Sequence, residues 1–178
     1  MIAQNARGGR IWSQENHFGT GSATIVLPQE FTVYTILFVC TGNTCRSPMA
    51  EAIARSLLDD SDVFVASAGV AAMDGAPTSP ETVRALASMD IEFQGHSTPL
   101  SPEMIRKADL ILCMTQSHQD HARRLVEGDS ELEEKILLLD PEGDVPDPIG
   151  QGQPRYDQLA KYFAKIIPDR VAALSPRS

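Results

Sequence analysis

Cysteine and positive charge are both scarce in this sequence. Only three cysteines occur in 178 residues, and two of them, Cys40 and Cys45, fall in one short segment. An odd number with this spacing does not form a disulfide framework, so we expect free thiols and a reducing, cytoplasmic environment. Lys and Arg number 15 against 24 Asp and Glu, and the formal net charge is −9. Nucleic acids and anionic membrane surfaces attract clustered cations, so neither is an expected partner.

Long hydrophobic runs are also missing. No apolar run approaches the roughly 20 residues that span a bilayer, and the first residues lack the charged head and apolar core of a secretory signal. The sequence therefore predicts neither a membrane span nor a secretory signal. A chain of 178 residues is long enough for one domain with a hydrophobic core and too short for two ordinary domains.

The stretch from residue 36 to residue 51 combines a strand, a tight loop and a helix. A short apolar run at residues 36–39 predicts a buried strand that stops at Cys40. Gly and Asn at residues 42–43 adopt left-handed backbone angles at low cost, which predicts a turn. Ser and Pro at residues 47–48 are typical of a helix N-cap and of the first helical residue. The expected result is a thiol where the strand ends and a guanidinium, that of Arg46, where the helix begins.

This arrangement predicts a phosphate site. A loop curled over a helix N-terminus points backbone N–H groups inward and adds the positive end of the helix dipole. Arg46 supplies a planar pair of donors for two phosphate oxygens. The same field favours thiolate over thiol at Cys40, and the Ser47 hydroxyl can donate to that sulfur, so phosphate site and nucleophile coincide as a cysteine phosphatase requires. The predicted phosphate-binding residues are Thr41, Gly42, Asn43, Thr44, Cys45, Arg46 and Ser47.

A family resemblance rests on the same residues. Cys40, five intervening residues, Arg46 and Ser47 match the Cys-x5-Arg-Ser signature of cysteine phosphatases. The longer string Cys-x-Gly-Asn-x-Cys-Arg-Ser-Pro-x-Ala-Glu resembles the low-molecular-weight protein tyrosine phosphatase family. The resemblance begins at about Thr35. It implies a phosphatase domain over residues 35–178 that acts on phosphorylated proteins without a metal or other cofactor.

Strands and helices alternate from residue 35 onward. The expected strands are residues 36–39, 63–66, 110–114 and 136–139, and the expected helices are residues 47–58, 80–89, 101–107, 117–127 and 155–173. Continuously apolar strands separated by helices predict a three-layer α/β fold, with a four-stranded parallel sheet covered by helices on both faces. We expect Pro168 to kink or break the last helix. Residues 1–34 are expected to form an N-terminal extension that is partly disordered or a marginal hairpin.

The loop after the last expected strand offers a general acid. A cysteine phosphatase needs a proton donor for the leaving atom. Composition alone does not choose among Asp140, Glu142, Asp144 and Asp147. The Asp-Pro pair that begins at Asp147 matches the pair that supplies the general acid in the resembled family. The predicted catalytic residues are therefore Cys40, Arg46 and Asp147.

Loop support is also implied by the resemblance. In the family, an Asn in the phosphate loop holds the backbone through hydrogen bonds to a His and a Ser further along the chain. These positions correspond to Asn43, His96 and Ser67, with Ser47 also supporting the loop.

The remaining Cys and His residues have other expected roles. Cys45 has two equal interpretations, a reversible disulfide with Cys40 under oxidation or a small packed side chain. Cys113 lies in an apolar run and is expected in the core. His118 and His121 lie three apart on an expected helix, a spacing that can bind metal, but no third ligand is near and no metal site is expected.

Two positions bear on the substrate. Tyrosine-specific members of the resembled family carry a bulky aliphatic residue where this chain has Thr44, and those resembling protein arginine phosphatases carry Thr. The tyrosine enzymes also place aromatic residues where this chain has Ile149. Both differences favour phosphoarginine, with phosphotyrosine as the alternative. Arsenate reductases share the loop but need two further cysteines, and only Cys113 remains for that role. Nothing in the sequence indicates an oligomeric state.

Overall fold

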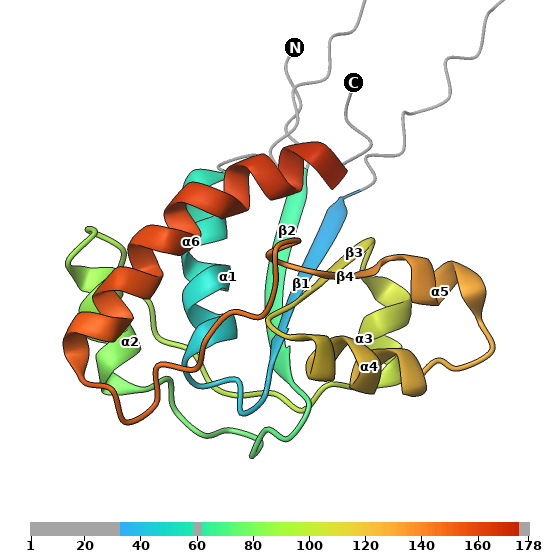
Figure 1. The fold of residues 1–178 in the computed structure, drawn as a ribbon, viewed down its shortest axis with the longest axis horizontal. Helices are drawn as coiled ribbons and strands as arrows, with labels where there is room; N and C mark the ends of the chain where they lie inside the picture. The colour runs from blue at the N-terminus through green and yellow to red at the C-terminus, as the bar shows by residue number, and fades with distance from the viewer. Residues whose placement is uncertain (1–32, 59–61, 175–178) are drawn as a thin grey trace, which may run out of the picture. The chain divides into compact units, whose positions relative to one another are not determined.

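Four parallel strands lie at the centre of the computed structural model, which describes residues 33–58 and 62–174 (Figure 1). The strands are β1 (Tyr34–Cys40), β2 (Val63–Gly69), β3 (Leu110–Cys113) and β4 (Ile136–Leu138), in the order β2-β1-β3-β4. All three strand pairs are parallel. The four residues of β3 and the last five of β1 are buried, as continuously apolar strands between two helical layers require.

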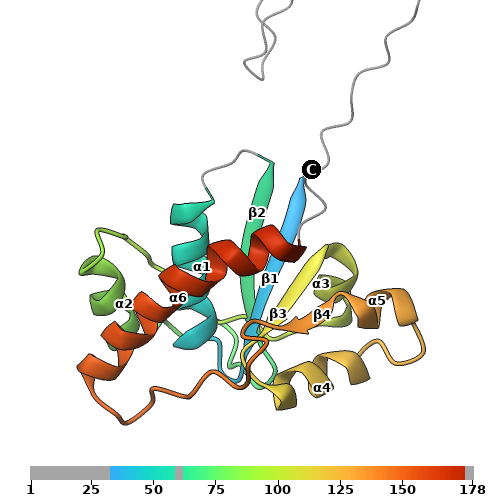
Figure 2. The same ribbon diagram turned by 45° about the horizontal axis from the view of Figure 1, so that its top comes forward.

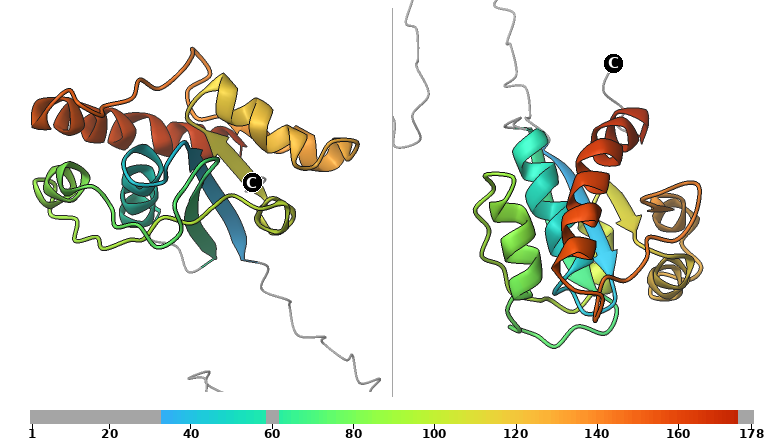
Figure 3. Two further views of the ribbon diagram at one scale, coloured as in Figure 1. Left: turned by 90° about the horizontal axis from the view of Figure 1, so that it is seen from below. Right: turned by 60° about the vertical axis from the view of Figure 1, so that its left-hand side comes forward.

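Helices cover both faces of the sheet, which confirms the three-layer α/β fold. One face carries α1 (Arg46–Leu57), α2 (Pro80–Ala87) and α6 (Gln153–Leu174), and the other carries α3 (Pro102–Lys107), α4 (Gln116–Arg124) and α5 (Ser130–Glu134) (Figures 2 and 3). Successive side chains of β1 alternate between the two layers. Ile36 and Phe38 join the core under α1 and α6, while Leu37 and Val39 join the core under α3 and α4. Each such side chain contributes about 1.5–3 kcal/mol on burial.

The strand order places the end of β1 at a topological switch point. The chain leaves β1 through α1 to reach β2 on one side, and β3 pairs with β1 on the other side. Connections that depart to opposite sides open a crevice beyond the carboxyl ends of such strands, where ligands bind. Cys40 is the last residue of β1 and therefore lies at this crevice.

The first strand begins earlier than expected, at Tyr34. The expected extension covers residues 1–34, of which residues 1–32 lie outside the described residues, so its disorder or hairpin is not tested there. Tyr34, which we assigned to the extension, and Thr35, the first residue of the expected phosphatase domain, pair with Val63 and Phe64 of β2. The parallel sheet of the domain thus supplies the pairing partner of these two residues.

The first helix corrects the predicted cap. We expected Ser47 as N-cap, but α1 begins at Arg46 with Cys45 as N-cap and no side-chain cap. The helix starts two residues earlier than expected because the Met49 N–H donates to the Cys45 carbonyl at 3.2 Å. The Ser47 hydroxyl lies among Cys40, Asn43 and Ala68 rather than capping the helix.

Two further differences concern helices. The last helix continues through Pro168 without ending; buried Ile167 and Val171 on either side hold it against the core despite the missing N–H. We did not predict α5, a five-residue helix with no buried side chain, capped by Asp129. Such a short exposed helix has no hydrophobic periodicity to detect. No helix among the described residues is long and apolar enough to cross a membrane.

Candidate active site

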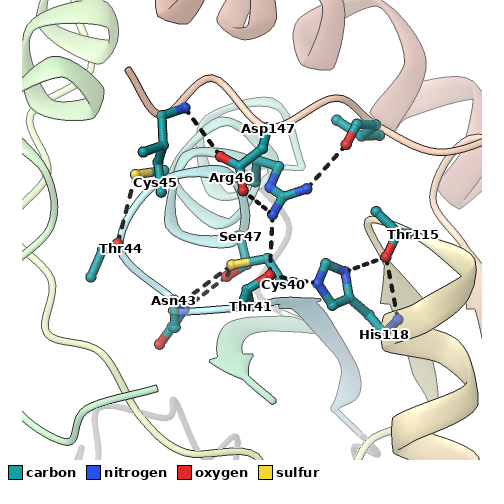
Figure 4. Close-up of polar contacts among 12 residues, drawn as sticks. Cys40, Thr41, Asn43, Thr44, Cys45, Arg46, Ser47, Thr115, His118 and Asp147 are labelled. Atoms are coloured by element: carbon teal, nitrogen blue, oxygen red, sulfur yellow. Dashed lines mark hydrogen bonds and ion pairs between the residues drawn. The ribbon is translucent and has the colours of Figure 1, made fainter. Parts of the chain in front are cut away.

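The loop of residues 41–45 joins the end of β1 to the start of α1 (Figure 4). Asn43 adopts a positive φ of 53°, which Asn tolerates better than most residues. Gly69, at the end of the neighbouring strand β2, packs directly against this loop. A Cβ on Gly69 would lie 2.5 Å from the Thr41 carbonyl oxygen and 2.9 Å from the Asn43 nitrogen. The loop can therefore adopt this backbone only beside a glycine.

The Cys40 sulfur is buried and faces hydrogen-bond donors. Its Sγ lies 2.9 Å from the Ser47 Oγ and accepts from the Asn43 backbone N–H at 3.3 Å. Asn43 Nδ2 donates to the same Ser47 oxygen at 2.9 Å, so the hydroxyl proton of Ser47 can point at the sulfur or at the more distant Ala68 carbonyl, 3.4 Å away. Donors aimed at a sulfur stabilise the thiolate, the nucleophilic form.

The side chain of Asn43 ties the loop to three other segments. Its Nδ2 donates to Ser47 and also to the Ser67 Oγ at 2.8 Å, and its Oδ1 accepts from the Thr98 N–H at 2.8 Å. With donors and acceptor all paired, the amide has a single orientation. The predicted supporting contacts of Asn43 with Ser67 and Ser47 are present in the structure.

The contact implied for His96 is absent from the described residues. The Asn43 oxygen that would meet it is taken by the backbone N–H of Thr98. The backbone of His96 instead forms an isolated bridge with Pro77, and its exposed side chain lines a pocket of about 250 Å³ together with Glu51 and Phe93. The backbone N–H of Thr98, two residues further on, carries no sequence signal, and the family resemblance pointed to the histidine instead.

The buried carboxylate of Glu51 extends the hydrogen-bond network of Asn43 and Ser67. The Ser67 hydroxyl donates to it at 2.5 Å, and Arg55 pairs with it at 2.6 Å. Burial raises the pKa of the Glu51 carboxyl above its usual range, while the hydrogen bond from Ser67 and the charge of Arg55 act in the opposite direction. Glu51 belongs to the family-like string in the sequence, but we did not assign it a role.

Arg46 is buried and held at three points. It donates from Nη1 to the Val145 carbonyl at 3.1 Å, and from Nη2 to Thr41 Oγ1 at 3.3 Å and to Asp147 Oδ2 at 2.5 Å. Its side chain is 6% exposed, against 42% for that of Asp147. The guanidinium is thus held in place beside the loop, and the carboxylate is the more exposed member of the pair.

The loop that carries Asp147 is pinned to the sheet. The Val145 N–H donates to the carbonyl of Met114, just beyond β3, at 2.8 Å, and Asp147 Oδ1 accepts from the Ile149 N–H at 3.1 Å. The structure brings together Cys40, Arg46 and Asp147, as the sequence predicts, although Asp147 lies 101 positions from Arg46 in the chain.

The other two cysteines point to different surroundings. Cys45 Sγ lies 3.4 Å from Ser79 Oγ and 3.5 Å from the Tyr156 hydroxyl, between the loop and the helices α2 and α6. Burial raises the pKa of the Cys113 thiol to about 12, which keeps it protonated and inert. All three cysteines are free.

His118 is a site residue that sequence analysis missed. It is 4% exposed, and its ring nitrogens lie 2.8 Å from Thr41 Oγ1 and 2.9 Å from Thr115 Oγ1 (Figure 4). We considered it only as a metal ligand with His121. The available signal was Thr115, an N-cap three residues before it, which places His118 in the first turn of α4 beside the sheet edge.

The ionisation of His118 provides a direct test of this environment. Burial, helped by the nearby Arg46 charge, lowers the pKa of His118 to about 4 from its ordinary 6.5. Between about pH 4 and pH 6.5 His118 binds a proton in the unfolded chain but not in the folded chain. This residue therefore lowers the free energy of unfolding as the pH falls through that range. We expect the His118 ring resonances in an NMR titration to shift near pH 4 in the folded protein and near 6.5 in urea. A folded midpoint near 6.5 would contradict the buried, neutral ring.

Comparison with known proteins assigns the family. The model of a family described as "Low molecular weight phosphotyrosine protein phosphatase" matches residues 35–174. A protein-arginine-phosphatase of Bacillus subtilis (strain 168) is 38% identical over 139 residues, covering 74% of this chain and 91% of that protein. A protein-arginine-phosphatase of Geobacillus stearothermophilus is 41% identical over 147 residues, covering 78% and 94%.

Solved structures agree with the sequence comparison. A crystal structure of a YwlE mutant from Bacillus subtilis matches with a TM-score of 0.71 at 34% identity, covering 79% of this chain and 97% of that chain. This chain therefore belongs to the low molecular weight phosphotyrosine protein phosphatase family and is a protein phosphatase.

Proposed function

We propose that this protein hydrolyses phosphoarginine in proteins through a cysteinyl-phosphate intermediate. Phosphotyrosine is the alternative substrate, and the family description names it. The observation that carries the proposal is the pair of residues at the edge of the site: Thr44 in the loop, and Ile149, 65% exposed, after the Asp-Pro pair. Thr44 is not the bulky aliphatic residue, and Ile149 is not the aromatic residue, that would hold a phenol ring.

The first step would be attack of the Cys40 thiolate on phosphorus. The S–P bond forms as the bond from phosphorus to the arginine nitrogen breaks, and the electron pair of that bond leaves with the nitrogen. Arg46 would hold two phosphate oxygens as their charge develops. Asp147, as the neutral acid, would give its proton to the departing nitrogen.

The second step would be hydrolysis of the cysteinyl phosphate. Asp147, now a carboxylate, would accept a proton from the water that attacks phosphorus. The S–P bond breaks and the electron pair returns to the Cys40 sulfur, where the Ser47 hydroxyl and the Asn43 N–H again stabilise the thiolate. Inorganic phosphate is the product.

Asp147 has a geometry suited to a guanidino substrate. Its carboxylate pairs with the guanidinium of Arg46 at 2.5 Å and remains 42% exposed. On its exposed side the protonated carboxyl that acts as the acid keeps an oxygen that can accept a hydrogen bond from a second guanidino group, that of the substrate arginine. A phenol has no positive group to offer in that place, which favours phosphoarginine.

A pair of matched peptides tests the proposal. Two peptides of one sequence, with phosphoarginine or phosphotyrosine at the central position, would be compared by kcat/KM with the full chain. We expect higher kcat/KM on the phosphoarginine peptide. Higher kcat/KM on the phosphotyrosine peptide would assign the alternative substrate. Acid-quench trapping of radiolabelled phosphate on the protein would test the intermediate separately.

The substitution Thr44→Ile should shift this preference toward phosphotyrosine. The added methyl groups supply an apolar wall for a phenyl ring and crowd a polar guanidino group, and such pocket changes alter discrimination about 10–200-fold. The measurement is the ratio of kcat/KM values on the two peptides. Thr44→Ser keeps the polar group and is the matched control, which should retain the wild-type ratio. An unchanged ratio in Thr44→Ile would remove Thr44 as the selecting residue.

The arsenate reductase alternative receives no support from the remaining thiol. Cys113, the third cysteine, lies fully buried in β3 with a pKa raised to about 12, whereas a relay of electrons needs accessible thiolates.

Three free thiols, one of them the expected nucleophile, favour a reducing compartment such as the cytoplasm. Cell fractionation of the full chain would test that location.

A further inference from the structure

A chain of hydrogen bonds links Arg46 to helix α4. Arg46 Nη2 donates to Thr41 Oγ1 at 3.3 Å, and the same oxygen lies 2.8 Å from His118 Nε2. On the far side of the ring, His118 Nδ1 lies 2.9 Å from Thr115 Oγ1. The phosphatase mechanism uses the side chain of the first residue, Arg46, and does not use the side chains of the other three.

The pairing in this chain suits a neutral imidazole. A guanidinium only donates, so Thr41 Oγ1 must accept from Arg46. When the Thr41 proton points to His118 Nε2, the ring is protonated at Nδ1 and donates to Thr115, and each contact has one donor and one acceptor. A protonated ring would instead place two cationic donors, His118 and Arg46, on one hydroxyl oxygen.

The surroundings of His118 keep the ring in that neutral form. Burial acts first and the Arg46 charge second, and both lower its pKa, with His121 on the same helix acting in the same direction. Asp144 and Asp147, on the loop that crosses above the ring, act in the opposite direction. The effect of burial on the pKa of His118 outweighs that of the two carboxylates, because the ring is only 4% exposed.

The catalytic cycle explains why Thr41 needs such a support. Arg46 Nη2 has two partners, Thr41 and Asp147. When Asp147 turns to protonate the leaving group, Thr41 is the protein partner that Nη2 retains among those in the structure. Thr41 itself is exposed, and an exposed threonine hydroxyl without a second contact rotates among its staggered rotamers.

We propose that His118 is a positioning residue that holds Arg46 in its phosphate-binding orientation through the hydroxyl of Thr41. The inference rests on the role proposed for Arg46 in phosphate binding, and it does not depend on which phosphorylated residue is the substrate. The effect should therefore appear with any phosphate ligand, including inorganic phosphate.

Two polar variants separate the two nitrogens of the ring. His118→Gln places an amide near the position of Nε2 and can reach Thr41, while His118→Asn reproduces only the Nδ1 side and can reach Thr115. Inhibition by inorganic phosphate and the kcat and KM for para-nitrophenyl phosphate would be measured with the full chain. We expect His118→Gln to stay within about threefold of wild type. We expect His118→Asn to lose about tenfold in phosphate affinity and in kcat/KM, the size of one net hydrogen bond.

A double-mutant cycle tests the path through Thr41. Thr41→Val should lose about as much phosphate affinity as His118→Asn, and the double variant should lose no more than either single variant, because both remove the same support. Additive losses would overturn the proposal, and so would equal values for the Gln and Asn variants. His121→Gln, on the same helix, is the control and should match wild type.

Thermal unfolding distinguishes positioning from general destabilisation. The Gln and Asn variants bury similar polar groups, so their Tm values should agree while their phosphate affinities differ. A loss of affinity that follows Tm across all variants would overturn the positioning role. If wild type hydrolysed para-nitrophenyl phosphate but not phosphoarginine peptides, the proposed substrate would be wrong and the test of His118 would stand unaffected.

Discussion

The substitution Cys40→Ser should abolish turnover while phosphate binding survives. Serine keeps the size of the side chain and its contacts with Ser47 and the Asn43 N–H, but its hydroxyl does not ionise near neutral pH. Loss of a covalent nucleophile costs on the order of 10⁴-fold or more in kcat. Arg46 and the loop amides are unchanged, so inorganic phosphate should bind with nearly wild-type affinity. Hydrolysis of para-nitrophenyl phosphate and phosphate titration by calorimetry measure the two quantities.

The matched control is Cys113→Ala, which removes a thiol from the core of β3. This variant should lose some stability and little activity, because the Cys113 thiol is buried and protonated. Full activity in Cys40→Ser would exclude cysteinyl phosphate as an intermediate. A Cys40→Ser protein that had also lost phosphate affinity would indicate a collapsed loop, which the calorimetric titration would reveal.

The substitution Asp147→Asn should slow hydrolysis according to the leaving group. An amide cannot donate the proton that a poor leaving group needs, so kcat on phosphoarginine or phosphotyrosine peptides should fall about 10²–10⁴-fold. Para-nitrophenol departs readily without a proton, so kcat on its phosphate ester should fall much less. The comparison of the two kcat ratios in wild type and variant is the measurement.

The ion pair between Asp147 and Arg46 offers a competing explanation. If Asp147 only held the guanidinium, its loss would weaken phosphate binding and reduce kcat/KM equally for every leaving group. We expect the opposite, unchanged or tighter binding of inorganic phosphate, because Arg46 keeps Val145 and Thr41 as partners. Asp144→Asn is the control on the same loop, where the carboxylate caps Gln116 at the start of α4. It should retain activity on both kinds of substrate.

Local sequence patterns identified most residues of the phosphate loop but few of the hydrogen bonds that hold it in place. Gly42 and Asn43 marked the turn, and the family-like string marked Cys40 and Arg46. The same local rules assigned Ser47 to the helix cap, although its hydroxyl belongs to Cys40 and Asn43. Capping rules consider only the nearest backbone, and here the thiol of Cys40 and the side-chain amide of Asn43 bind the Ser47 hydroxyl instead.

Long-range contacts escaped prediction for a related reason. Thr98 supports Asn43 through its backbone N–H, and every residue except proline carries that group, so no residue type marks the position. His118 resembled half of a metal site because its partner, Thr41, lies 77 positions away in the chain. The spacing of residues within one helix does not reveal which other segment packs against it.

The sequence alone determined the layered α/β fold, the position of the thiol at a strand end and the guanidinium that follows it, because hydrophobic periodicity and turn chemistry act over neighbouring residues. Only the tertiary structure decided that Asp147 meets Arg46, that Thr98 rather than His96 supports Asn43, and that His118 faces Thr41. These contacts join segments whose separation along the chain is large, and they form only when the parallel sheet brings the ends of its strands to one edge.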